Sequence, residues 1–276
     1  MLQQALDFKN ESEALHNLLQ DLDEADFEHE TLFKSWTIND VIGHLHMFNV
    51  AAEMSLADEP AFLKFSGSLS DALDEPRGML DFTDAWLDGL KGRALLAAWI
   101  ENSVSMAEAF KQVDPKRRLK WVGPDMSALS YVTARLMETW AHGQELYDLL
   151  GVERRNHDRI RNIAIMGVNT FGWTFRNRGL AIPEPAPFVR LTAPSGAVWE
   201  WNDPKAESRI DGEAVDFCQV VTQVRNVADT GLVTTGETAR QWMALAQCFA
   251  GPPNDPPAPG TRYRQHSFRP VAASAG

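Results

Sequence analysis

The amino-acid sequence predicts an α+β protein, in which an N-terminal four-helix bundle is followed by a smaller α+β domain. The first observation is that leucines and other apolar residues recur at helical spacing through most of residues 1–152. The second is a Pro-rich segment at 181–187 that interrupts this pattern. The third is a pair of short strand-like segments after it, separated by the turn-forming sequence Pro194-Ser195-Gly196.

The N-terminal half contains clear start and stop signals for helices. Thr37 and Asp40 are spaced as a capping box, with Asp in place of the usual Glu, and predict a helix that begins there. Asp114-Pro115 ends another helical pattern, because proline does not continue a helix easily. Gly151 follows a long helical run, as a C-terminal cap would. We therefore expect helices over residues 2–22, 37–56, 82–113 and 127–150, with an irregular segment at 57–79.

The C-terminal half changes to a mixture of strands and helices. A fifth helix over 158–177 is expected to end near Gly179 and to connect the two parts. The strands are expected at 188–193, 197–201 and 207–210, and the helices at 215–225 and 238–249. The predicted division is a bundle at 1–152, a connecting helix within 153–180, an α+β domain at 181–252 and a Pro/Ala-rich tail at 253–276.

The composition is that of a globular protein with an acidic surface. The 276 residues are 44% hydrophobic and 23% charged, and the formal net charge is -12. An acidic surface gains no counterion release from nucleic acid or an anionic membrane, so neither is expected as a partner. The sequence shows no apolar run of about 18 residues, it shows no signal-peptide core, and its two cysteines, Cys218 and Cys248, are isolated. These features favour a cytoplasmic location.

Two chemically reactive side chains share one face of the predicted helix at 127–150. Glu138 and His142 are four residues apart, so they project from the same face one turn apart. His44 falls on the inward face of the predicted helix at 37–56. Two imidazoles and a carboxylate with an open fourth position are a donor set of catalytic zinc. Spacing alone leaves two other interpretations open, since Glu138 and His142 also suit a solvated or hydrogen-bonded pair and His44 suits a core histidine.

Two segments carry a resemblance to a known family. Residues 36–45, Trp-Thr-Ile-Asn-Asp-Val-Ile-Gly-His-Leu, resemble the W-[ST]-x-x-D-[VL]-x-x-H-[LV] signature of the DinB-like superfamily. Residues 135–148 are similar to the second signature of its mycothiol-dependent maleylpyruvate isomerase family, in which Glu and His four residues apart follow an Arg. That family often has Asp three residues after the His, where this chain has Glu145. The segments 221–230 and 239–243 resemble the smaller domain of its two-domain members.

The resemblance implies a cofactor and a type of chemistry. It implies that His44, Glu138 and His142 bind one divalent metal ion, usually zinc, with nickel and iron as alternatives that suit the same donors. It also implies a thiol-dependent isomerase or S-transferase that acts on a small-molecule substrate with a thiol cosubstrate such as mycothiol. Hydrolysis is a third reaction that no residue excludes. The alternative from another class is a non-catalytic metal-binding protein that binds or senses a small ligand. Homodimer formation stays open in either case.

Three further residues are candidates for the catalytic machinery. Arg135 lies one turn before Glu138 and suits either an anchor for a substrate carboxylate or an ion pair with Glu138, and the ion pair is the favoured interpretation. Glu145 suits either a hydrogen-bond acceptor for His142 or a surface charge. Arg225 suits either a residue that reaches a cleft between the domains or, more simply, an arginine on a surface helix.

Overall fold

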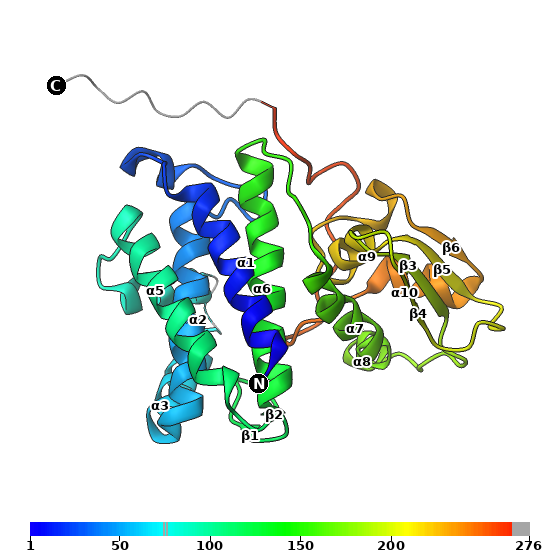
Figure 1. Cartoon of the computed structure of the whole chain (residues 1–276), viewed down its shortest axis with the longest axis horizontal. Coiled ribbons are helices and arrows are strands. Elements are labelled where there is room, and N and C mark those ends of the chain that lie inside the picture. Colours follow the sequence, from blue (N-terminus) through cyan, green and yellow to red (C-terminus); the bar gives the residue numbers. More distant parts are fainter. Residues whose placement is uncertain (74, 76, 267–276) are drawn as a thin grey trace. The chain divides into compact units, whose positions relative to one another are not determined.

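The computed structural model describes residues 1–73, 75 and 77–266 of the chain (Figure 1). Its helices and small sheets confirm the predicted α+β class. The described part of the chain divides into two compact units, the first formed by Met1–Val152 together with Gln265 and His266, and the second by Glu153–Arg264. Among the described helices, none combines the length and the apolar character that crossing a membrane requires.

Within the described residues, four long helices build the bundle of the first unit (Figure 1). α1 packs against α5 and α6, while α2 packs mainly against α5 and also reaches α6. The inward faces bury leucines and aromatic side chains, which supply most of the stabilising apolar area. The bounds of these helices are α1 Gln3–Leu19, α2 Ile38–Ala57, α5 Gly92–Lys111 and α6 Ala128–Leu149.

Helices α2 and α6 have well-defined ends. The Thr37 hydroxyl accepts a hydrogen bond from the backbone N–H of Asp40 at 3.1 Å, and the Asp40 carboxylate accepts one from the backbone N–H of Thr37 at 2.8 Å. This reciprocal pair is the predicted capping box, and it fixes the start of α2. The Ser127 hydroxyl caps α6 by accepting from the backbone N–H of Ser130 at 3.1 Å. At the other end, Gly151 adopts a positive φ of 69°, as helix termination by glycine requires.

The prediction of an irregular segment at 57–79 is wrong. Most of it is a helix, α3 (Glu59–Ala72), whose first turn contains Pro60. Proline is tolerated there because the backbone N–H groups of the first turn have no partner within the helix. The side chain of Asp58 caps the same end by accepting from the backbone N–H of Ala61 at 3.1 Å.

The prediction of one helix over 82–113 is also wrong. The chain forms α4 (Gly78–Leu87), turns, and starts again as α5. The break is local, because Asp88 and Gly89 adopt positive φ angles of 48° and 84°, which a right-handed helix does not accommodate. Two short elements complete the first unit. They are a 3-10 helix, η1 (Glu24–Glu28), and an antiparallel hairpin of β1 (Arg118–Leu119) and β2 (Met126–Ser127).

The second unit contains a four-stranded sheet in the order β4-β3-β5-β6. The predicted turn at Pro194-Ser195-Gly196 joins β3 to β4, and β3 pairs in parallel with β5. β6 has only three residues, which is too short for an alternating pattern, and the sequence did not predict it. The strands are β3 Phe188–Thr192, β4 Val198–Trp201, β5 Arg209–Glu213 and β6 Val233–Thr235.

Helices accompany this sheet, and the range of the predicted fifth helix contains three of them, the 3-10 helix η2 followed by α7 and α8. α7 packs against α9, α8 packs against α10, and Thr170 separates α7 from α8. The segment 153–180 therefore packs within the second unit, so the sequence-based boundary at 181 differs from the division of the structure. Of the predicted tail at 253–276, residues 267–276 lie outside the described residues. The helices are η2 Asp158–Ile160, α7 Arg161–Asn169, α8 Phe171–Asn177, α9 Ala214–Val221, η3 Val227–Asp229 and α10 Glu237–Leu245.

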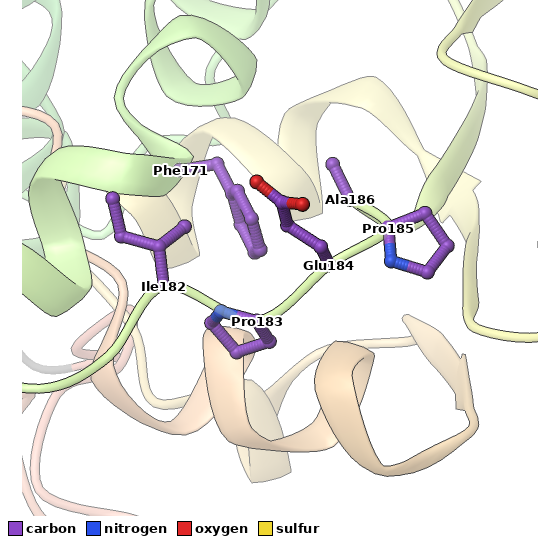
Figure 2. Close-up of a pocket in the computed structure, with 6 residues that line it drawn as sticks. All are labelled: Phe171, Ile182, Pro183, Glu184, Pro185 and Ala186. Atoms are coloured by element: carbon purple, nitrogen blue, oxygen red, sulfur yellow. The ribbon is translucent and has the colours of Figure 1, made fainter.

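A surface pocket of about 570 Å³ lies in the second unit, along the Pro-rich segment (Figure 2). Its lining is mostly apolar, and Glu184 brings the one carboxylate to it (Figure 2). The pocket contains none of the candidate site residues. It is lined by Phe171, Ile182, Pro183, Glu184, Pro185 and Ala186.

Candidate metal centre

The structure brings His44, Glu138 and His142 together inside the bundle. His44 projects from α2, while Glu138 and His142 project from one face of α6. One Glu138 carboxylate oxygen, Oε2, lies 3.6 Å from Nε2 of His44 and 3.3 Å from Nε2 of His142. One ligand atom from each of the three side chains lies within 4.8 Å of the other two. The two segments therefore meet at one point, although they are almost a hundred residues apart.

The two distances from Glu138 to the imidazoles suit ligands of a single tetrahedral ion. Two ligands that each lie about 2.0–2.1 Å from a tetrahedral centre are roughly 3.3–3.4 Å apart. The separations between Glu138 and the two imidazoles, 3.3 and 3.6 Å, are close to that value. Within the described residues, no fourth His, Cys, Asp or Glu joins the group. A metal held here would have three protein ligands and a position for water or substrate.

The surroundings favour the protonation states that a metal requires. Burial lowers the pKa of His44 to about 4, with smaller contributions from His142 and Arg135, and the hydrogen bond to Glu138 opposes them. Burial alone would raise the pKa of Glu138, but hydrogen bonds to His142 and His44 and their charges outweigh it and hold the pKa well below its usual range. At neutral pH, His44 therefore offers a lone pair and Glu138 a negative charge.

Aromatic rings enclose the three donors. Trp36 stacks on the His142 ring, with centroids 5.7 Å apart and an angle of 6° between the planes, and Phe33 meets the same ring edge-on at 5.2 Å. Phe48 lies 4.8 Å from the His44 ring. Nδ1 of His44 has no hydrogen-bond partner among the described residues, so packing rather than an acceptor fixes this ring. The donors still retain 11% (His44), 23% (Glu138) and 14% (His142) side-chain exposure, which leaves the centre open to a small ligand.

Arg135 does not form the favoured ion pair. No Arg135–Glu138 contact within ion-pair distance occurs in the described part of the chain. Instead, Nε of Arg135 donates to Oδ1 of Asn49 at 2.9 Å, and Nη2 donates to the backbone carbonyl of Leu45 at 3.2 Å. The residue is only 1% exposed, so direct contact with a substrate carboxylate is not available either. Both interpretations drawn from the sequence are therefore wrong, because spacing within α6 does not reveal a partner on α2.

The other two catalytic candidates are also buried. Glu145 is 3% exposed, which rules out the surface-charge interpretation, and its role beside His142 stays a prediction. Arg225 is 9% exposed and lies beyond the end of α9, where its Nη1 donates to the Val224 carbonyl at 3.1 Å. The interpretation of Arg225 as a surface-helix arginine is therefore wrong.

Sequence reasoning did not assign the residues around the donors to the site. Helical spacing placed Phe48, one turn after His44, on the same inward face, but it did not predict that the two rings meet. Trp36 was visible as the first residue of the signature, but its stacking on His142 joins distant parts of the chain. Asn49 carried no signal, because its contact with Arg135 depends on how α2 and α6 are packed.

Comparison with known proteins identifies the family. The model of the mycothiol maleylpyruvate isomerase N-terminal domain matches residues 8–147, which include all three donors. The chain is 37% identical over 247 residues to the uncharacterized proteins MT0041 and Rv0036c of two Mycobacterium tuberculosis strains, CDC 1551 / Oshkosh and H37Rv. These matches cover 90% of this chain and 95% of each relative.

Solved structures share the fold at low sequence identity. The crystal structure of the mycothiol-dependent maleylpyruvate isomerase matches with a TM-score of 0.54 and 14% identity, over 84% of this chain and 91% of that one. A variant of that enzyme with a histidine replaced by alanine matches over the same shares, with a TM-score of 0.52. The family match over residues 8–147, half of the chain, leads to one conclusion: this chain belongs to the mycothiol-dependent maleylpyruvate isomerase family.

Proposed function

We propose that this protein is a metal-dependent enzyme of the maleylpyruvate isomerase type, which uses a low-molecular-weight thiol as cosubstrate. His44, Glu138 and His142 would hold one divalent ion, with zinc as the first candidate and nickel or iron as alternatives. The convergence of these three donors within 4.8 Å carries the proposal. Membership of the family supplies the thiol and the class of substrate, an unsaturated oxo acid such as maleylpyruvate.

The donor set suits activation of a thiol. A bound divalent ion supplies positive charge that stabilises a thiolate, the reactive form of a thiol, at neutral pH. Imidazole ligands bind a metal ion through neutral nitrogens, so Glu138 is the only one of the three donors that would reduce this charge. Trp36, Phe33 and Phe48 exclude bulk water around the donors, which strengthens electrostatic interactions there.

In a thiolate-dependent isomerisation, the thiolate that adds to the substrate is released again at the end. The sulfur adds to one carbon of the conjugated double bond, and the electron pair of that bond moves toward the carbonyl group. The remaining single bond rotates, the pair returns, and the carbon–sulfur bond breaks to release the thiolate. An S-transferase would differ only in the last step, because a leaving group on the electrophile would depart in place of the thiolate.

An incomplete set of protein ligands favours catalysis over the non-catalytic alternative. A structural or sensing site is typically closed by a fourth protein ligand, whereas catalytic sites keep one position for water or substrate. Among the described residues, the group consists of three donors. This observation gives the enzyme the stronger support, and an isomerase and an S-transferase fit it equally well.

Metal content and activity together test the proposal. Protein purified without a His tag should contain stoichiometric metal by mass spectrometry, and His44→Ala should lose it, while His16→Ala on α1 serves as a matched control. The metal-loaded protein should convert maleylpyruvate in the presence of mycothiol and not in its absence, with glutathione tested in parallel. Native protein without metal would refute the site. Native protein with metal but no activity toward any unsaturated oxo acid and thiol would favour the non-catalytic alternative.

A further inference from the structure

A buried arginine links the two helices that carry the donors. Arg135 belongs to α6, one turn before Glu138, and its guanidinium reaches across to α2. There it donates to the side chain of Asn49 at 2.9 Å and to the carbonyl of Leu45, the residue after His44, at 3.2 Å. Two N–H donors of the rigid Arg135 guanidinium therefore hold α2 next to the His44 imidazole.

Asn49, the acceptor on α2, also makes a hydrogen bond to a third helix, α5. The side-chain amide of Asn49 donates to the Ser103 hydroxyl on α5 at 3.0 Å, and that hydroxyl donates to the Trp99 carbonyl at 2.7 Å. Asn49 is fully buried, so its oxygen must face Arg135 and its NH2 group must face Ser103 for both to be satisfied. The charged guanidinium is the stronger partner and orients the amide oxygen toward itself, while Ser103 accepts from the NH2 group on the other side.

A small number of side chains set the distance between α2 and α6. α2 packs mainly against α5, and α6 packs mainly against α1, while the direct contact between α2 and α6 is smaller. The metal donors lie across this smaller contact. A side chain that spans it with two hydrogen bonds therefore has a large influence on the distance between His44 and Glu138.

We propose that Arg135 is a positioning residue for the metal centre, which sets the separation of His44 from Glu138 by fixing α2 against α6. This inference rests on the proposed metal site. The burial of Arg135 excludes direct contact with substrate, and the two acceptors on α2 account for its donors Nε and Nη2. Residues that orient metal ligands without touching the metal typically affect affinity by about 10- to 100-fold when replaced.

Variants that conserve the charge of Arg135 separate its positioning effect from its electrostatic effect on metal binding. Removing the positive charge of Arg135 would by itself strengthen binding of a cation, so a neutral substitution would mix two opposite effects. Arg135→Lys keeps the charge and loses the two-donor fork, and Asn49→Ala keeps the arginine and loses its side-chain acceptor. Ser103→Ala is the matched control, because it removes the outer hydrogen bond of the same network and leaves the Arg135–Asn49 contact in place.

The measurements are the zinc dissociation constant from chelator competition and the visible spectrum of bound cobalt, which reports coordination geometry. Arg135→Lys and Asn49→Ala should bind zinc about 10- to 100-fold more weakly and give an altered cobalt spectrum. Ser103→Ala should match the native protein in both. Circular dichroism checks folding, and if one variant does not fold, the other decides.

Two results would overturn the inference in different ways. Folded variants of Arg135 and Asn49 with native zinc affinity and a native cobalt spectrum would overturn the positioning role alone and leave the proposed function intact. A native protein that binds neither zinc nor cobalt would overturn the metal site, and the positioning role with it. An equal loss of affinity in Ser103→Ala would show a general packing effect and would also contradict a specific role for the fork.

Discussion

Replacing Glu138 by Gln tests the candidate centre with little change of shape, because the two side chains are nearly isosteric. The native carboxylate lies 3.3 Å from Nε2 of His142 and 3.6 Å from Nε2 of His44, and it is the only acid among the three donors. Burial alone would raise its pKa, but the two imidazoles outweigh burial and keep the residue charged. Gln offers an oxygen without that charge. We therefore expect Glu138→Gln to fold and to bind a divalent ion much more weakly.

The size of the effect follows from ligand linkage. A ligand that binds only the folded protein stabilises it by about 2.7 kcal/mol when its free concentration is a hundred times Kd. In a unit of this size, each kcal/mol raises Tm by roughly 2–4 °C, so zinc should raise the Tm of the native protein by about 5–11 °C. If Glu138→Gln weakens binding about a hundredfold, the gain at the same zinc concentration falls to about 0.4 kcal/mol, or about 1–2 °C.

Thermal unfolding of chelator-treated protein, with and without added zinc, measures this difference directly. Glu108→Gln provides the control, since Glu108 is an exposed acid on α5 outside the donor group, and its zinc-dependent shift should equal that of the native protein. A full shift in Glu138→Gln would refute the role of the carboxylate as a ligand. The absence of a shift in the native protein would refute the site itself.

Three other predictions concern the fold around the centre. Thr37→Ala removes the cap of α2 and should lower the free energy of unfolding by about 1 kcal/mol in urea titration. Tyr131→Phe should change the free energy of unfolding by less than about 1 kcal/mol, because the buried Tyr131 hydroxyl has Ser55 near it but no well-formed hydrogen bond among the described residues, and a larger loss would contradict this. Burial raises the pKa of Cys218 well above its usual value, so a thiol reagent at pH 8 should label this residue only after unfolding.

Local sequence signals predicted the ends of helices correctly where contacts between neighbouring residues determine those ends. The reciprocal bonds of Thr37 and Asp40 start α2 as their spacing indicated, and Gly151 ends α6. The same reasoning failed at Pro60, where proline opens a helix instead of breaking the pattern. It also failed at Asp88, whose positive φ divides a continuous amphipathic pattern into α4 and α5. The dipeptide Asp88-Gly89 is typical of turns, so the sequence carried a signal for this break, and the continuous helical pattern outweighed it in the prediction.

The candidate site also has a part that local spacing predicts and a part that depends on contacts between distant segments. Glu138 and His142 could be paired from helical spacing, which also placed His44 on an inward face, and the resemblance of two segments to family signatures then favoured the set of three over the other interpretations. Contacts between distant segments could not be predicted, such as the stacking of Trp36 on His142. The partners of Arg135 are the clearest example, because an ion pair within one helix was the simplest expectation and the guanidinium crosses to another helix instead. Such contacts depend on the packing of the bundle, which spacing along one helix does not describe.

The position of Arg135 also has a consequence for the chemistry that the centre favours. Its guanidinium lies close enough to Glu138 for their charges to interact, although they form no ion pair. The positive charge of this arginine partly offsets the negative charge of the carboxylate, so a divalent ion bound to the three donors would keep a net positive charge toward a further ligand. Aromatic side chains around the donors strengthen that field by excluding water. An anion gains most from such a field, and therefore a thiolate suits this centre better than a neutral thiol.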